Sequence, residues 1–97
     1  MHNEANDSIR ACKDLFHIFS DMTRLRIIDL LIERPHNVQS ICAALDLKQS
    51  TVSHQLRMLR ERNIVKYERN GKHIIYSLKD EHVKTIYLMA KDHVNEC

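Results

Sequence analysis

The chain has 97 residues, 43% of them hydrophobic, with 15 basic and 13 acidic side chains and a formal net charge of +2. This length predicts one small domain over residues 1–97, and the hydrophobic fraction is typical of a globular chain rather than a disordered one. No apolar run reaches the roughly 18–20 residues that a membrane-spanning helix needs, and the N-terminal residues lack the pattern of a signal peptide. We therefore expect a cytoplasmic protein with no membrane partner.

The charge is distributed unevenly along the chain. Residues 1–47 hold five basic and seven acidic side chains, whereas residues 48–79 hold eight basic and two acidic ones, a local charge of +6. The tail from residue 80 returns to −2, with two lysines against four acids. A strongly basic segment indicates a surface that binds nucleic acid.

Three helices are predicted in the first half of the chain. Asp7 or Ser8 can cap the first helix, whose apolar face is Ile9, Cys12, Phe16 and Phe19. Ser20-Asp21 can cap the second, which ends before Pro35 and has a core stripe of Leu25, Ile28, Leu31 and Ile32. Asn37 can cap a short third helix with Ile41, Cys42 and Leu45 facing inward. Asp46 then follows at a sharp turn, where it tolerates the left-handed conformation.

The next helix is predicted over residues 49–62. Its buried side is Val52, Leu56 and Leu59, and short hydrogen-bonding side chains lie on or near the opposite side. Two helices joined by a tight turn, the second of them polar on its outer face, indicate a helix-turn-helix.

A β-hairpin is predicted after this helix. The runs 65–69 and 72–78 are rich in β-forming residues, and Asn70-Gly71 between them is the strongest short hairpin signal. A helix-turn-helix followed by a hairpin with basic residues at its tip predicts a winged helix, a mainly α fold with a β-hairpin wing (α+β). Arg69 and Lys72 at the tip are placed to meet phosphate or the minor groove.

The last predicted helix, over residues 80–96, carries a candidate metal site. At about 100° per residue, His82, Ile86, Met89, His93 and Glu96 share one stripe, which Asp80 joins as the N-cap. Asp80, His82, His93 and Glu96 form a tetrahedral N/O set suited to zinc. His82 and His93 lie roughly 16 Å apart along the axis, so one chain cannot close the site. Two antiparallel copies of the helix can, and the sequence therefore predicts a homodimer with two metal sites at its interface.

Three runs carry a resemblance to a known family: Asp-Met-Thr-Arg-Leu-Arg-Ile-Ile (21–28), Gln-Ser-Thr-Val-Ser-His-Gln-Leu-Arg-Met-Leu (49–59) and Gly-Lys-His-Ile-Ile-Tyr-Ser-Leu (71–78). Over nearly the whole chain they resemble the ArsR/SmtB family of metal-sensing winged-helix repressors. The Ser-x-Val-Ser-His-Gln-Leu run is quite specific to that family. The final helix is similar to the zinc-sensing branch, whose ligands are Asp, His, His and Glu at these positions.

The chain departs from the family pattern in places. Members that sense thiophilic metals use a Cys-x-Cys pair at the start of the third helix, where this chain has Asn37 and Gln39, so that site is not expected. Asp46 and Asn63 replace the usual glycines before and after the recognition helix, and both accept positive φ. Lys48 stands where a capping Ser is common.

The resemblance implies a zinc-responsive transcriptional repressor that binds operator DNA as a homodimer and is released when metal binds. It implies no enzyme activity and no small-molecule substrate. Contacts at or near the bases are expected from Gln49, Ser50, Thr51, Ser53, His54 and Gln55. Phosphate contacts are expected from Arg57, Arg69 and Lys72. A backbone carbonyl near Arg62-Asn63 is the expected acceptor for a ligating imidazole.

Other functions remain open. A cobalt- or nickel-responsive repressor could use His2 and the amino terminus as further ligands, cadmium also suits the donors, and Cys97 could join beside Glu96. A redox-sensing DNA-binding regulator would use Cys12, Cys42 or Cys97. A zinc enzyme is disfavoured, since four protein ligands leave no open position for substrate.

Overall fold

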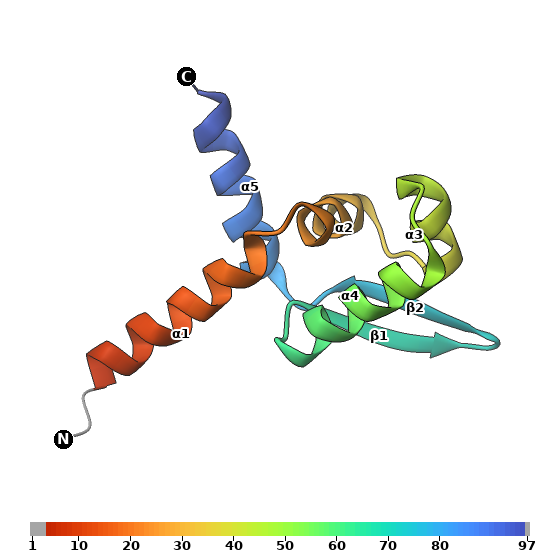
Figure 1. The fold of residues 1–97 in the computed structure, drawn as a ribbon, viewed down its shortest axis with the longest axis horizontal. Coiled ribbons are helices and arrows are strands. Elements are labelled where there is room, and N and C mark those ends of the chain that lie inside the picture. The colour runs from red at the N-terminus through yellow and green to blue at the C-terminus, as the bar shows by residue number, and fades with distance from the viewer. Residues whose placement is uncertain (1–3, 97) are drawn as a thin grey trace.

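The computed structural model describes residues 4–96 as five helices and one antiparallel hairpin. In chain order they are α1 (Glu4–Phe19), α2 (Met22–Glu33), α3 (Val38–Leu45), α4 (Gln49–Glu61), β1 (Val65–Asn70), β2 (His73–Leu78) and α5 (Glu81–Asn95). The helices α2, α3 and α4 gather beside the hairpin, and α1 and α5 extend away from this body (Figure 1). The winged helix-turn-helix fold expected from the sequence is thereby confirmed. None of the described helices is long and apolar enough to cross a membrane.

The core lies where α2, α3, α4 and the base of the hairpin meet. Its buried side chains are Ile18, Ile27, Ile28, Leu31, Ile41, Val52, Leu56, Leu59, Ile64, Val65 and Val83. Each such burial contributes roughly 1.5–3 kcal/mol relative to exposure. The predicted inward faces of α3 and α4 are confirmed, whereas on α2 the buried stripe includes Ile27 and leaves Leu25 and Ile32 half-buried.

Side-chain caps fix the starts of three helices as the sequence predicted. Carboxylate or amide oxygens of Asp21, Asn37 and Asp80 accept the backbone N–H three residues ahead, at 3.0, 2.8 and 3.1 Å. Lys48, at the start of α4, makes no such side-chain hydrogen bond. Asp46 and Asn63 have φ values of 55° and 60°, so both adopt the left-handed conformation that was expected of them.

The wing is a two-residue hairpin whose turn differs by one residue from the prediction. Asn70 pairs with His73 across the strands, so Gly71 and Lys72 form the loop, rather than Asn70 and Gly71. Gly71 has φ of 64°, and Lys72 has no positive φ. A glycine at positive φ in the first loop position is the pattern of a type II′ turn, in which the second position has no need of glycine.

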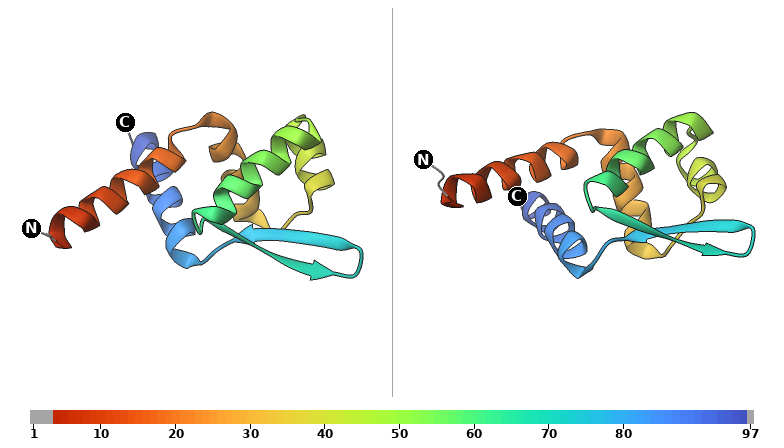
Figure 2. Two further views of the ribbon diagram at one scale, coloured as in Figure 1. Left: turned by 60° about the horizontal axis from the view of Figure 1, so that its bottom comes forward. Right: turned by 90° about the horizontal axis from the view of Figure 1, so that it is seen from below.

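The helix α1 faces the core with a different side from the one predicted. Ile18 is buried and Leu15 packs against the core, whereas Ile9 and Phe16 are 65% and 61% exposed. The helix also begins by Glu4 instead of at Asp7 or Ser8. Figure 2 shows the reason for the exposure: most of α1 projects beyond the body, at the end opposite the hairpin tip. The predicted apolar face therefore exists, but within one chain only Phe19 of it packs against the core.

His36 joins the helix-turn-helix to the wing. Its backbone exchanges two hydrogen bonds with Tyr76 of β2, at 3.0 and 2.8 Å, and its Nδ1 lies 2.7 Å from the Ser40 hydroxyl of α3. The side chain is 4% exposed. Burial first, and then the positive charge of Arg34, lowers the pKa of His36 from its ordinary value of 6.5, against a smaller opposing effect of Glu33. The ring is therefore neutral in the folded protein at neutral pH.

This burial predicts a pH dependence of stability. Because the pKa of His36 is lower in the folded chain than in the unfolded chain, the unfolded chain binds more protons as the pH falls below about 6.5. The free energy of unfolding that the neutral ring contributes is therefore complete above that pH and is lost below it. One such proton changes the free energy of unfolding by at most about 1.4 kcal/mol per pH unit. Urea unfolding of the wild type should lose stability more steeply from about pH 7 to about pH 5.5 than His36→Asn, which keeps a partner for Ser40 without titrating. Equal slopes would contradict this role of His36.

Candidate DNA interface and metal-ligand helix

The outer face of α4 carries most of the side chains predicted to read DNA. Because Val52, Leu56 and Leu59 are buried against the body, the opposite side of the helix meets solvent. Its exposed polar side chains are Gln49, Ser50, Ser53, His54 and Arg57. The helix follows α3 through the left-handed Asp46, the geometry in which a second helix is presented to a major groove.

Two residues of the predicted DNA-binding set lie closer to the body. Thr51 and Gln55 are half-buried, and the Gln55 side-chain oxygen lies 3.5 Å from Nη1 of Arg24 on α2. The same guanidinium donates through Nε to the Ile18 carbonyl at the end of α1, at 2.7 Å. Arg24 therefore joins α1, α2 and the recognition helix, a link that no local sequence pattern indicated. The predicted DNA contacts of Thr51 and Gln55 stay predictions.

The wing places its basic side chains at an exposed tip. Arg69 pairs with Ile74 in the strand register, and Lys72 lies in the turn beyond it. Both side chains are exposed. At the base of the wing, the Tyr67 and Tyr76 rings lie 5.9 Å apart, and the Arg60 guanidinium lies 5.0 Å from the Tyr67 ring centroid. The cation–π contact of Arg60 with Tyr67 joins the end of α4 to the wing.

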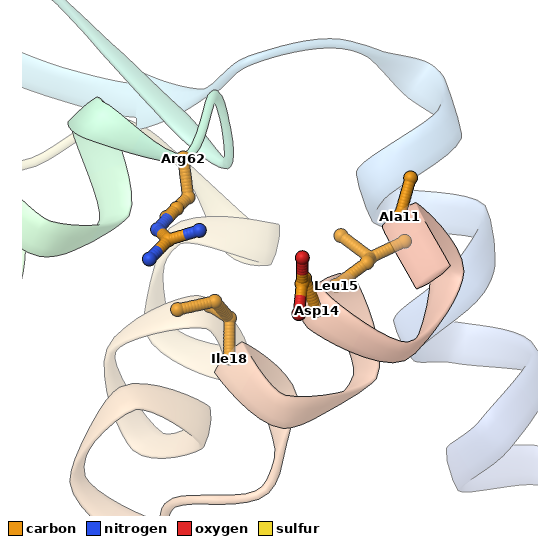
Figure 3. A pocket seen from close by; sticks show the side chains of 5 residues that line it. All are labelled: Ala11, Asp14, Leu15, Ile18 and Arg62. Atoms are coloured by element: carbon orange, nitrogen blue, oxygen red, sulfur yellow. The ribbon is translucent and has the colours of Figure 1, made fainter. Parts of the chain in front are cut away.

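The basic residues of α4 differ in their surroundings. Arg57 forms an exposed ion pair with Glu61 at 3.1 Å, a contact weak enough in water to yield to a phosphate. Arg62, just after the helix, points into a hollow that α1 lines with Ala11, Asp14, Leu15 and Ile18 (Figure 3). The end of the recognition helix is therefore next to α1, and Arg62 lies away from the outer face of α4.

The candidate metal ligands lie at the two ends of α5. One oxygen of Asp80 accepts the Val83 N–H at 3.1 Å, and the other lies 3.7 Å from Nδ1 of His82, whose side chain is 91% exposed. His93 and Glu96 are exposed at the far end of the helix. Over residues 4–96, no three His, Cys, Asp or Glu side chains gather closely enough to hold one ion. The two donors at each end of α5 can complete a metal site only if a second chain supplies the other two ligands.

The described residues also include two of the three cysteines and the two positions at which sensors of thiophilic metals carry a Cys-x-Cys pair. Cys42 packs at the edge of the core, and Cys12 is exposed on α1. Asn37 serves as the cap of α3, and Gln39 is exposed beside it. His2 and Cys97, considered as further metal ligands, lie outside the described residues.

Comparison with known proteins agrees with this architecture. Residues 21–67 match the family described as bacterial regulatory protein, arsR family. Over 90 residues the chain is 38% identical to a transcriptional repressor SmtB homolog from Synechocystis, covering 93% of this chain and 68% of the relative. Over 83 residues it is 37% identical to a cadmium resistance transcriptional regulatory protein CadC homolog from Staphylococcus aureus, covering 84% of this chain and 69% of the relative.

This chain belongs to the ArsR/SmtB family. The fold agrees as well: a homodimeric winged helix-turn-helix DNA-binding domain from Mycobacterium bovis superimposes with a TM-score of 0.91, at 21% identity, over 99% of this chain and 89% of that one. The ArsR-family chain is therefore a DNA-binding transcriptional repressor, and the expectation that it is not an enzyme is confirmed.

Substitutions on the predicted DNA interface of this ArsR-family protein should have two kinds of effect on DNA binding. Lys72→Ala should weaken binding to all duplexes alike and reduce the salt slope of the binding constant by about one, because it removes a predicted phosphate contact. Ser53→Ala should instead narrow the gap in affinity between operator and random DNA. Fluorescence anisotropy over a series of salt concentrations measures both effects.

The control for these variants is Lys84→Ala, which removes a lysine from α5, outside the basic segment. It should leave both quantities unchanged. If Lys72→Ala and Ser53→Ala change the same quantity, the division into phosphate and base contacts is wrong.

Proposed function

We propose that this protein is a zinc-responsive repressor that binds operator DNA as a homodimer and is released when metal binds between the subunits. The observation that carries the proposal is the arrangement of donors on α5. Asp80 and His82 lie at one end, His93 and Glu96 lie at the other, and all four are exposed. A site of this composition is complete only when a second α5 runs antiparallel to the first.

The apolar surface of α1 and α5 supports the homodimer. A hollow of about 340 Å³ between these helices is lined by Phe16, Phe19, Leu25, Ile86, Tyr87, Ala90, Lys91 and Val94. Phe16, Met89 and Val94 are each more than 60% exposed. Contiguous apolar surface of this kind marks an interaction site. Val83, near the start of α5, is not part of this surface, because it is buried in the core of the single chain.

The chemistry of the donors supports zinc over the alternatives without excluding them. Two imidazoles and two carboxylates satisfy tetrahedral zinc, and imidazole also suits cobalt and nickel. One relative is a cadmium resistance regulatory protein homolog, so cadmium belongs in the same test. The bound ion would supply a rigid cross-link between two α5 helices. The chain's part is to hold Asp80 by its N-cap bond and to present both imidazoles on the exposed surface of α5.

The proposed coupling runs from α5 to the recognition helices. Fixing the register of two α5 helices fixes the spacing between the two α4 helices, and operator half-sites tolerate only one spacing. A ligating imidazole has a second ring N–H to donate, and a backbone carbonyl near Arg62-Asn63 is the proposed acceptor. That segment ends α4, so a hydrogen bond there would act directly on the recognition helix.

The first prediction of this proposal concerns assembly. Metal-free protein should sediment as a dimer at micromolar concentration, because the surface of α1 and α5 is too apolar to remain exposed. Phe16→Asp should shift it towards the monomer, and Glu4→Asp on the same helix should not. A wild-type monomer would contradict the proposal.

The second prediction concerns the metal. A duplex selected from a random library by the metal-free protein serves as the operator. Saturating zinc should weaken its binding by a factor of the order of 5–150, the usual range for allosteric coupling. His82→Ala and His93→Ala should each still bind the duplex but lose the response to zinc. Cys12→Ser should keep the response, which separates the zinc mechanism from a redox mechanism at that exposed thiol. Cobalt, nickel and cadmium are titrated in parallel.

Mixing the two histidine variants provides the sharper test of shared ligands. In a mixed dimer one site contains both defects and the other contains none, provided that the ligands come from opposite chains. Such dimers should bind one tight zinc ion and recover part of the response, whereas neither mutant homodimer binds zinc tightly. If mixing restores no tight site, the ligands are not shared across the interface.

A further inference from the structure

We propose that Asp29 of α2 is the positioning residue that holds α5 against the DNA-binding body and transmits the state of α5 to the recognition helix. The proposal rests on the proposed function, since it concerns how metal on α5 changes operator affinity. It adds a residue that is neither a metal ligand nor on the DNA-binding face.

Asp29 forms a bridge between two helices that are far apart in sequence. The Tyr87 hydroxyl donates to Oδ1 of Asp29 at 2.8 Å, and the Lys91 ammonium donates to the same oxygen at 2.9 Å. The Lys91 ammonium also lies 5.9 Å from the Tyr87 ring centroid. The hydrogen bonds from Lys91 and Tyr87 keep the pKa of Asp29 below its ordinary value, so the carboxylate stays ionised at neutral pH.

The bridge lies on the side of α5 opposite the metal ligands. At about 100° per residue, Tyr87 and Lys91 are about 140° and 180° around the helix from His82, whereas His93 is within about 20° of it. The helix therefore carries its donors on one side and its link to α2 on the other. A tilt or rotation imposed at the donors must move Tyr87 and Lys91 relative to Asp29.

Lys91 is also the last polar link between α5 and the rest of the described chain. Val83 anchors the start of the helix in the core, and residues 88–96 are exposed. Among the hydrogen bonds and ion pairs of residues 4–96, none joins a part of α5 beyond Lys91 to another element. The contact with Asp29 is thus the last polar contact that constrains the direction of the segment carrying His93 and Glu96. Because that ion pair is about half-exposed, its contribution to stability is small.

The helix α2 continues the connection to the DNA-binding helices. Arg26 donates to the Leu45 carbonyl at the end of α3, at 2.9 Å, and Arg24 lies against Gln55 of α4. Ile27 and Ile28, between these arginines and Asp29, are fully buried in the core. A rigid helix with α5 attached at Asp29 and α4 attached through Arg24 is a continuous physical path between the two proposed sites.

The test compares operator affinity with and without saturating zinc in wild type, Asp29→Ala, Asp29→Asn, Tyr87→Phe and Lys91→Met. Lys84→Met is the matched control, because Lys84 is the other lysine of α5 and makes no ion pair in the described part of the chain. Metal-free operator affinity and zinc stoichiometry should stay within about twofold of wild type in every variant. The ratio of operator affinity without zinc to operator affinity with zinc should fall towards one in Asp29→Ala. It should be intermediate in Asp29→Asn, whose amide oxygen still accepts hydrogen bonds. Lys84→Met should keep the wild-type ratio.

The outcomes separate the two proposals. If the wild type does not respond to zinc, the proposed function fails, and this inference fails with it. If the wild type responds and Asp29→Ala keeps its ratio within about twofold, the role of Asp29 is overturned and the proposed function stands. If Asp29→Ala does not fold, Tyr87→Phe and Lys91→Met provide the test. A smaller ratio of zinc-free to zinc-bound operator affinity in both variants supports the bridge, and an unchanged ratio in both overturns it.

Discussion

The burial of Ile27 and Ile28 on α2 is the interaction on which the rest of this structure depends. Both side chains are fully buried, and they lie on the helix that every other helix contacts through a named side chain. Arg24 reaches the end of α1 and Gln55 of α4, Arg26 reaches the end of α3, and Asp29 holds α5. The apolar side of α2 is therefore part of the core, and its polar side contacts each of the other helices.

The small size of the chain has a direct consequence for its assembly. The buried core comes mostly from α2, α3, α4 and the base of the wing, which leaves large apolar side chains of α1 and α5 in solvent. Covering that surface with a second chain would stabilise both subunits by the hydrophobic effect. In the proposed dimer the apolar surface and the metal ligands would both involve α5, so assembly and metal sensing would depend on the same helix.

The distribution of charge separates the two proposed sites. The segment from Lys48 to Lys79 has a charge of +6 and contains the outer face of α4 and the wing, whereas the tail that contains α5 has a charge of −2. Figure 1 shows α5 directed away from the tip of the wing. A cation bound at the ends of α5 would be far from the phosphates that the wing is predicted to contact, and Coulomb interactions beyond about 10 Å are largely screened at cellular salt. Its effect on DNA binding would therefore have to pass through the structure, which is the role proposed for Asp29 and α2.

The sequence by itself determined the local features of this protein. The caps at Asp21, Asn37 and Asp80, the left-handed Asp46 and Asn63, the inward face of α4 and the presence of the wing all follow from short-range chemistry that is visible in a few consecutive residues. The exact turn of the wing was misplaced by one residue, since Asn-Gly favours a hairpin without fixing which two residues form its loop.

Only the tertiary structure decided which surfaces meet. Periodicity showed that α1 has an apolar face, but it could not show that Ile18 enters the core while Ile9 and Phe16 stay in solvent. In the same way, Gln55 matched a DNA-reading pattern, and only the packing of α2 revealed Arg24 beside it. Asp29 and Lys91 are 62 residues apart, and nothing in either local sequence indicates the other. The physical reason is that helix periodicity depends on neighbours three or four residues away, whereas the partner of a face depends on how all the helices fill one core.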